Sequence, residues 1–272
     1  MIFTLPYTYM QSCNWFLENV SSNEALCAVF VMWLNTEITY ALVVSFFYYV
    51  EQSGKFTKYK IHEQPSDGKM FRDAILFKPI TWLVDVPIYF MSYKMMGWRI
   101  LDFGVDKSKP MPSPLDPLPD GSTLFYQVAT LVLIFDFLFY CWHRALHTKF
   151  LWKYHKKHHE VKVSFSCAND HEDPVELAGN ILWKMVSPAL MCCHVYTVCV
   201  FRAIVKFFAL LHHSGFELPA FQFIQRIPGI ASPAGHDFHH YYGEGNYGGV
   251  FMVWDRIFGT ERCVDVLTKK MK

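Results

Sequence analysis

The sequence is poor in charged residues and has no basic residue near its start. Charged residues make up 18% of the 272 residues, against about 25% in an ordinary soluble domain. The net charge is +1 with neutral histidines, so no long-range attraction to nucleic acid is expected. No Lys or Arg precedes Lys55. Because a cleavable signal peptide begins with a positive segment, none is expected here.

The eight cysteines lack both the spacing of a disulfide framework and any CxxC pair. Several lie in apolar runs, where cysteine usually acts as a small hydrophobic residue, so they indicate no redox compartment. No internal repeat is visible. In contrast, 52% of the residues are hydrophobic and 18% are aromatic. This composition excludes a disordered or fibrous chain and favours lipid-facing helices.

Three apolar runs predict membrane spans, at residues 25–50, 79–93 and 123–142. The first is long enough to cross a bilayer core of about 30 Å, and the second is interrupted by Asp85 and Pro87. Residues 177–191 and 195–211 are expected to form a helical hairpin. We therefore predict an all-α integral membrane bundle, with about four to five spans or a re-entrant hairpin, and with a cytosolic His-rich helical cap.

The distribution of basic residues predicts the orientation of these spans. Residues 51–78 carry six Lys or Arg, so this loop is expected in the cytosol and the N-terminus in the lumen. Three crossings then place His143 at the cytosolic face, and the hairpin returns the chain there near His212. The glycosylation sequon at Asn19 would face the lumen.

Twelve of the thirteen histidines lie between His143 and His240. Three local groups stand out: His143 with His147; His155 with His158 and His159; and His236 with His239 and His240. Imidazoles three or four residues apart on a helix share a face, so each group can direct two or three rings toward one ion. Neutral imidazole suits Fe, Zn, Cu or Ni, and eight imidazoles exceed the ligands of one tetrahedral ion. The pattern therefore predicts two metals at one centre.

Polar residues near these groups have open interpretations. Asp136 and Tyr140 share a helical stripe with His143 and His147. Asp136 either orients a ligand imidazole or a water from behind, or makes a polar contact with a neighbouring helix. Tyr140 is a candidate for the same supporting role. Asp85 is expected to pack or to contact a helix.

The remaining histidines are ranked by their position. His213 ends the predicted hairpin and is a candidate ligand, and His212 is a weaker one. His171 and His194 are weaker still, with His194 expected at the far turn of the hairpin. His62 is expected to be solvated or at the membrane interface.

These motifs resemble those of the fatty acid hydroxylase and sterol desaturase superfamily of membrane-bound non-haem di-iron oxygenases, whose pattern is HxxxH, HxxHH and a final HxxHH. Residues 139–147 resemble the first box with its leading aromatic pair, and residues 213–219 resemble the family's HSG segment. Residues 236–240, 246–247 and 254–260 are similar to its C-terminal signature. The resemblance covers roughly residues 125–262 and implies a catalytic domain at 123–262. Residues 1–122 would then form the N-terminal membrane spans and a Pro-rich connector, and residues 263–272 would form a C-terminal tail.

The resemblance also implies cofactors and ligands. It implies two Fe ions, O2 as co-substrate, and two electrons from NAD(P)H through a reductase, with cytochrome b5 as an expected partner. One oxygen atom would enter an unactivated C–H bond of a lipid taken from the bilayer. The ligands so implied are His143, His147, His155, His158, His159, His213, His236, His239 and His240.

Within the superfamily, the HSG segment and the WDRIFGT ending resemble the sterol branch, which contains C-4 methylsterol oxidases and cholesterol 25-hydroxylases. The chain length and residues 59–62 are similar to the 25-hydroxylases. One departure concerns Asp173, which stands before Pro174-Val175-Glu176 where methyl oxidases usually carry His. Either the site has one ligand fewer there, or His171 substitutes.

Other functions stay open on the sequence. The same centre would serve a hydroxylase or desaturase of another lipid, such as a fatty acyl or alkyl lipid. A zinc-binding or metal-transport membrane protein would use the histidines without oxygen chemistry, although transporters favour ligands near the membrane midplane. The ending Lys269-Lys270-Met271-Lys272 resembles a dilysine retrieval signal, which predicts the endoplasmic reticulum membrane.

Overall fold

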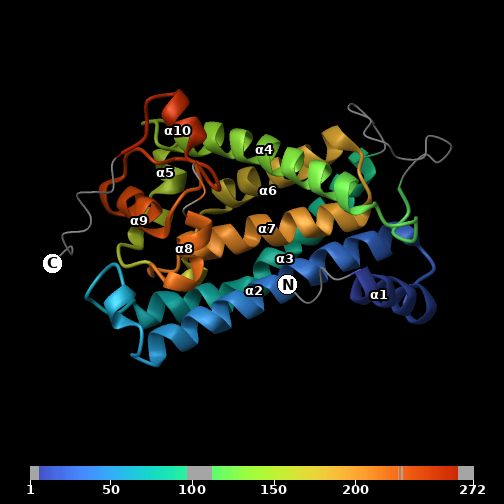
Figure 1. Cartoon of the computed structure of the whole chain (residues 1–272), viewed down its shortest axis with the longest axis horizontal. Helices are drawn as coiled ribbons and strands as arrows, with labels where there is room; N and C mark the ends of the chain where they lie inside the picture. Colours follow the sequence, from blue (N-terminus) through green and yellow to red (C-terminus); the bar gives the residue numbers. More distant parts are fainter. Residues whose placement is uncertain (1–5, 97–111, 226, 228, 263–272) are drawn as a thin grey trace. The chain divides into compact units, whose positions relative to one another are not determined.

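The computed structural model describes residues 6–96, 112–225, 227 and 229–262, and the dilysine-like ending lies outside them. The long helices are α1 (Pro6–Asn19), α2 (Glu24–Gln52), α3 (Gly68–Met96), α4 (Gly121–Leu146), α6 (Pro174–Met191) and α7 (Val195–His212) (Figure 1). The shorter helices are α5 (Trp152–His155), α8 (Pro219–Gln225), α9 (Pro233–Tyr242) and α10 (Val253–Ile257), with 3-10 turns at Thr57–Tyr59, His158–Glu160 and Ser166–Asp170. Over the described residues, β pairing is limited to the single bridges Lys60–Phe216 and Ile230–Phe251. The predicted all-α class is confirmed.

Four helices are long and apolar enough to cross a membrane: α2, α3, α4 and α7. They contain the three predicted spans and the second arm of the predicted hairpin. The first arm forms α6, which contains Pro188 and is not among the four candidate spans found in the described part of the chain. The expected multi-pass membrane character is therefore supported by these four helices.

Helix α3 differs from the sequence-based expectation at its start. Residues 68–78 were expected in a basic loop, but α3 already begins at Gly68. The reason is local, since the Asp67 carboxylate accepts hydrogen bonds from the Lys69 and Met70 amides at 2.8 and 3.2 Å. Such a cap satisfies donors that the first helical turn leaves unpaired. The loop between α2 and α3 is thereby shortened to residues 53–67.

The described chain forms two compact units. One comprises the described parts of residues 1–40, 80–135 and 180–206, and the other comprises the described parts of residues 41–79, 136–179 and 207–272. The second, here called the His-bearing unit, contains all nine candidate metal ligands. The predicted division at residues 122 and 262 stays a prediction.

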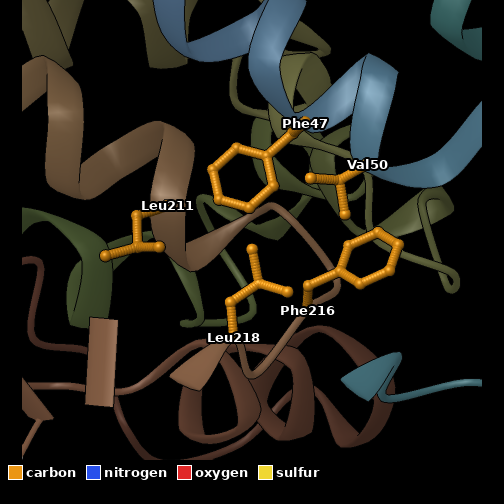
Figure 2. Close-up of a cluster of buried hydrophobic side chains, with 5 residues drawn as sticks. All are labelled: Phe47, Val50, Leu211, Phe216 and Leu218. Atoms are coloured by element: carbon orange, nitrogen blue, oxygen red, sulfur yellow. The ribbon is translucent and has the colours of Figure 1, made fainter. Parts of the chain in front are cut away.

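A buried apolar cluster stabilises the His-bearing unit beside His213. It joins Phe47 and Val50 of α2, Leu211 of α7, and Phe216 and Leu218 of the following segment. Figure 2 shows these five side chains pointing toward one another. Burial of each such side chain contributes about 2 kcal/mol. The cluster therefore holds the segment after His213 firmly against α2 and the end of α7.

Candidate metal centre

The nine histidines come from five short parts of the His-bearing unit. His143 lies in the last turn of α4, and His147 follows its end. His155 ends α5, whereas His158 and His159 occupy the next 3-10 turn. His213 follows the last residue of α7, and the final three lie on α9. Local secondary structure thus places the histidines of each sequence motif near one another, and tertiary packing must bring the motifs together.

Helix α9 begins with a strong local signal. The Ser232 hydroxyl accepts a hydrogen bond from the Gly235 amide at 3.0 Å, and Pro233 occupies the first helical position. Serine caps the free amides of a first turn, and proline there loses no helical hydrogen bond. On this helix His236, His239 and His240 share one face, as their spacing predicted.

The structure gathers the nine imidazoles into two groups in which one ligand atom per residue lies within 4.8 Å of the others. The first group, here called group A, contains His143, His147, His155, His159 and His239. The second, group B, contains His158, His213, His236 and His240. Eight of the nine are buried and His147 is half-buried. Each group could hold one metal ion.

The neighbouring pairs in the sequence divide between the groups. His158 and His159 are consecutive, but one lies in group B and the other in group A. His239 and His240 divide in the same way. The His159 and His240 rings, from different groups, stack at 4.9 Å. The two groups are therefore adjacent, which is the arrangement that two metals at one centre require.

Backbone carbonyls fix which ring nitrogen carries the proton in several of these histidines. His143 Nδ1 donates to Tyr247 O at 2.9 Å, and His239 Nδ1 donates to Gly245 O at 2.7 Å. A carbonyl can only accept, so the proton lies on Nδ1 and Nε2 carries a lone pair. Both Nε2 atoms are buried and lack a hydrogen-bond partner over the described residues. Such second contacts orient imidazoles for metal binding.

The ring nitrogens of group B show most directly whether these histidines can bind a cation. His213 Nδ1 donates to Ala209 O at 2.7 Å, and His158 Nδ1 lies 3.3 Å from His171 O. Their Nε2 lone pairs then face each other at 3.2 Å. The Nε2 atoms of His236 and His240 lie 3.0 and 3.1 Å from the same His213 atom. Facing lone pairs repel unless a cation lies among them, so this donor set fits a metal ion.

Gly215 allows the chain to turn directly after His213. Its φ is +75°, and a Cβ added there would lie 2.6 Å from Ser164 O. A residue with a side chain would meet both backbone strain and a collision. The Gly215 carbonyl accepts the Ile61 amide at 2.9 Å. This explains why the HSG segment needs its glycine.

Burial keeps the imidazoles in the neutral form that binds metals. It lowers the pKa of His147 to about 2, and the pKa values of His159 and His213 to about 3 each. For His147, neighbouring imidazoles lower the pKa further. All three rings are therefore neutral at pH 7.

This burial predicts acid sensitivity of the folded protein. The unfolded chain takes up protons on these histidines near pH 6.5, whereas the folded imidazoles resist protonation until about pH 3. The unfolded state binds more protons in this window, so stability falls as pH falls below about 6.5. We expect the thermal midpoint and the amount of bound metal to decrease together from neutral pH toward about pH 4. A midpoint that stays constant across this range would contradict the prediction.

The other predicted residues lie elsewhere. His171 Nε2 lies 3.3 Å from Glu160 Oε2, and its carbonyl oxygen lies 3.3 Å from His158 Nδ1 of group B. Both ring nitrogens of His212 contact carbonyls, of Gly249 and Ala231. In the other unit, His194 precedes α7 and its Nε2 lies 3.0 Å from Asp116 O. These three residues are outside both groups formed by the described residues.

Asp136 and Tyr140 form hydrogen bonds with the part of the chain that follows α9. The Asp136 carboxylate accepts the Val250 and Phe251 amides at 2.6 and 3.1 Å. It therefore holds the loop whose Tyr247 carbonyl accepts a hydrogen bond from His143. The Tyr140 hydroxyl contacts Thr260 Oγ1 at 3.0 Å and accepts from Arg144 at 3.1 Å. Their roles in metal binding remain our proposal.

The prediction that His62 is solvated is wrong, and its alternative, a position at the membrane interface, stays a prediction. His62 is buried, and its Nε2 lies 2.6 Å from Asp237 Oδ2. Asp237 follows His236 on α9, and its other oxygen accepts the Ser164 hydroxyl at 2.7 Å. The pair joins the α2–α3 loop to the helix that carries the last three candidate ligands. Sequence reasoning missed it because the partners are 175 residues apart.

Glu176 is a second residue that the sequence analysis did not assign. Its Oε1 lies 2.8 Å from His155 Nδ1, with both side chains almost fully buried. The Pro-Val-Glu segment at 174–176 was its only visible signal. A carboxylate in this position raises the basicity of a ligand imidazole and fixes its orientation.

We expect Glu176→Gln to weaken metal binding by about 10–100-fold, since an outer carboxylate of this kind has that effect elsewhere. Iron retained per chain after dialysis against graded chelator would measure it. Glu160→Gln is the matched control, because this exposed carboxylate pairs with His171 instead. Equal retention in the two variants would contradict the role of Glu176.

Comparisons with known proteins match the part of the sequence that forms this centre. A fatty acid hydroxylase family model matches residues 128–260, which include all nine candidate ligands. A very-long-chain aldehyde decarbonylase from rice, Oryza sativa, is 31% identical over 221 residues, covering 78% of this chain and 77% of the relative. A methylsterol monooxygenase from Arabidopsis thaliana is 28% identical, covering 79% of each chain. Another, from Aspergillus fumigatus, is 26% identical over 98% of this chain and 94% of the relative. No solved structure matches the chain significantly.

Proposed function

The chain belongs to the fatty acid hydroxylase family, and on this premise we propose that it is a membrane-bound di-iron monooxygenase that hydroxylates a sterol. The observation that carries the proposal is the convergence of nine imidazoles into two adjacent groups of neutral donors. Group A would hold one iron and group B the other. Bound iron supplies the activation of O2, which amino-acid side chains cannot perform.

The protein's own contribution is placement and a dry environment. Carbonyls fix the proton of His143, His239 and His213 on Nδ1, so their Nε2 atoms need no rearrangement to bind metal. Burial keeps water away from the centre and keeps the rings neutral. Preorganised ligands of this kind hold a metal without spending free energy on reorganisation.

Two substrate classes have specific support. A sterol is supported by the methylsterol monooxygenase relatives and by the C-terminal signature at residues 236–260. A long-chain aldehyde is the second candidate, because the rice relative named for that substrate has 31% identity. Hydroxylation or desaturation of another acyl or alkyl lipid is the remaining alternative. We favour the sterol because the similarity to one methylsterol monooxygenase extends over nearly the whole chain.

The cellular setting is proposed from the same features. The protein would lie in the endoplasmic reticulum membrane, with the histidine groups facing the cytosol and the N-terminus facing the lumen. Two electrons per turnover would come from NAD(P)H through a reductase, with cytochrome b5 as the expected carrier. Glycosylation of an inserted acceptor at the N-terminus, but not in the loop at residues 53–67, would support this orientation.

The test is lipid profiling of cells that express the chain or a His239→Ala, His240→Ala variant. We expect oxidised sterols only with the unchanged chain, and iron in the purified protein near two per chain. Purified protein supplied with reductase, NAD(P)H and O2 should convert a sterol more readily than a long-chain aldehyde. Equal oxidised sterols in both cell lines would overturn the assignment, and zinc binding without O2 consumption would favour a non-enzymatic protein.

A further inference from the structure

The His-bearing unit contains a cavity of about 880 Å³ that the proposed metal chemistry does not use. Its walls come from the second half of α2, the α2–α3 loop, the first half of α3, and Phe216. The volume lies within the usual range of roughly 300–1,000 Å³ for small-molecule sites. The cavity therefore has room for a lipid-sized ligand.

The lining has a polar end and an apolar end. On α2, Val44 and Tyr48 lie further from the loop than Glu51, with successive residues rising by about 1.5 Å along the axis. On α3, Phe71 and Ile75 lie progressively further from the loop than Gly68. Most polar lining residues thus lie where the two candidate spans meet their loop, and the lining along the spans is mainly apolar, with Ser45 on α2 and Arg72 on α3 as polar members. A membrane amphiphile has the same polarity, with its polar group at the interface.

At the polar end of the cavity, the charges of Glu51 and Lys60 balance each other and both side chains are hydrogen-bonded. Lys60 Nζ donates to Glu51 Oε1 at 2.7 Å, and Ser66 Oγ donates to Glu51 Oε2 at 2.8 Å. The Ser66 amide also donates to Glu51 at 3.2 Å. A carboxylate accepts about four hydrogen bonds and an ammonium donates three, so each can bind one further group. A hydroxyl, which both donates and accepts, suits this pair better than an anion, which the Glu51 carboxylate would repel.

The apolar walls are aromatic and firmly held. The rings of Tyr48 and Phe71 stack at 5.3 Å, and Phe71 contacts Phe165 at 5.8 Å. Phe216 belongs to the buried cluster with Phe47 and Val50 (Figure 2). Tyr48 and Ile75 are also partly exposed, which leaves the cavity accessible from the side of the spans. The site is therefore preformed and open to a lipid.

The inner wall of the cavity belongs to the segment that carries His213. Phe216 follows His213 by three residues and pairs with Lys60 through an isolated β bridge. The Glu217 amide also donates to Tyr59 O at 2.9 Å. A ligand against Phe216 would thus rest on the segment that positions a group B imidazole.

We propose that this cavity binds an uncharged, hydroxyl-bearing lipid, with its hydroxyl between Glu51 and Lys60 and its body against Tyr48, Phe71 and Phe216. The inference rests on the proposed function and makes the cavity the site where the sterol substrate is taken from the bilayer. The charged lining residues are two acids, Glu51 and Glu63, and two bases, Lys60 and Arg72, and this equal number favours an uncharged lipid over a fatty acid.

The test uses the full chain in detergent–lipid micelles and a photoreactive diazirine sterol with a free hydroxyl. Labelled peptides should map to residues 44–75 and 216. The O-methyl ether of the probe should label about tenfold less, since it cannot donate the hydroxyl hydrogen bond. Ile75→Trp fills the cavity and should reduce labelling by a similar factor, as should Ser45→Trp on the facing helix. Leu76→Trp is the matched control, because this neighbouring side chain is 67% exposed and does not line the cavity.

The outcomes separate the cavity from the chemistry, because labelling requires neither iron nor electrons. Labelling that maps elsewhere, or that persists in both Ile75→Trp and Ser45→Trp, overturns the cavity site, even if oxidised sterol is still formed. Equal labelling by a diazirine fatty acid overturns the selectivity for an uncharged lipid. Labelling as expected without any sterol oxidation supports the cavity and overturns the proposed function instead.

Discussion

Replacement of His213 by glutamine is expected to reduce product formation by more than about 100-fold and, for the proposed pair of irons, to lower bound iron from two per chain to one. His213 Nε2 lies within 3.2 Å of the Nε2 atoms of His158, His236 and His240. It is therefore the member of group B that touches all the others. Glutamine has similar bulk but offers an amide in place of the imidazole lone pair. Iron analysis of purified protein, paired with turnover in the presence of reductase and O2, would measure both effects.

His212→Gln is the matched control for this prediction. His212 is adjacent in sequence and equally buried, but its two ring nitrogens contact the carbonyls of Gly249 and Ala231. A glutamine amide has two N–H donors, so it can serve both carbonyls. We expect this variant to retain two irons. Loss of iron in His212→Gln but not in His213→Gln would refute the composition of group B.

The His motifs could be predicted because each one is local. His236, His239 and His240 lie on one face of α9 because helical geometry places residues three and four apart together. The sequence could not show that His158 and His159 divide between two groups, since this depends on how α4, the 158–160 turn and α9 pack. The prediction of paired metals came from the number of imidazoles. Their arrangement required tertiary structure.

Residues that act through distant partners were harder to predict. His62 has no histidine near it in sequence, and its partner Asp237 was visible only as the residue between His236 and Phe238. Glu176 was noticed as part of a Pro-Val-Glu segment, but nothing local pairs it with His155. The start of α3 was misjudged for another reason, because charge along residues 68–78 indicated a loop while the Asp67 cap favoured a helix. In each case the structure depends on a contact that forms in the folded chain and that composition alone does not indicate.

Removal of the Asp136 carboxylate is expected to destabilise the protein by about 3 kcal/mol, because the amides of Val250 and Phe251 would lose their acceptor. The carboxylate is fully buried and accepts from Val250 and Phe251. The loop lies directly on α4, since a Cβ on Gly249 would be 3.2 Å from Asp136 Oδ1 and 2.9 Å from the Phe139 ring. Asp136→Ala should lower the thermal midpoint most. Asp136→Asn, which keeps one acceptor oxygen, should have a smaller effect.

The same substitution should also affect the metal, which separates a positioning role from a purely structural one. The loop held by Asp136 contains the Tyr247 carbonyl, which fixes the tautomer of His143 at 2.9 Å. Below its thermal midpoint, Asp136→Ala should therefore bind iron about 10–100-fold more weakly, as expected when the support of a ligand is lost. Asp85→Ala is the control, because this carboxylate lies in α3 and is only half-buried. Asp136 would be a structural residue alone if its alanine variant bound iron as tightly as Asp85→Ala while melting at a lower temperature.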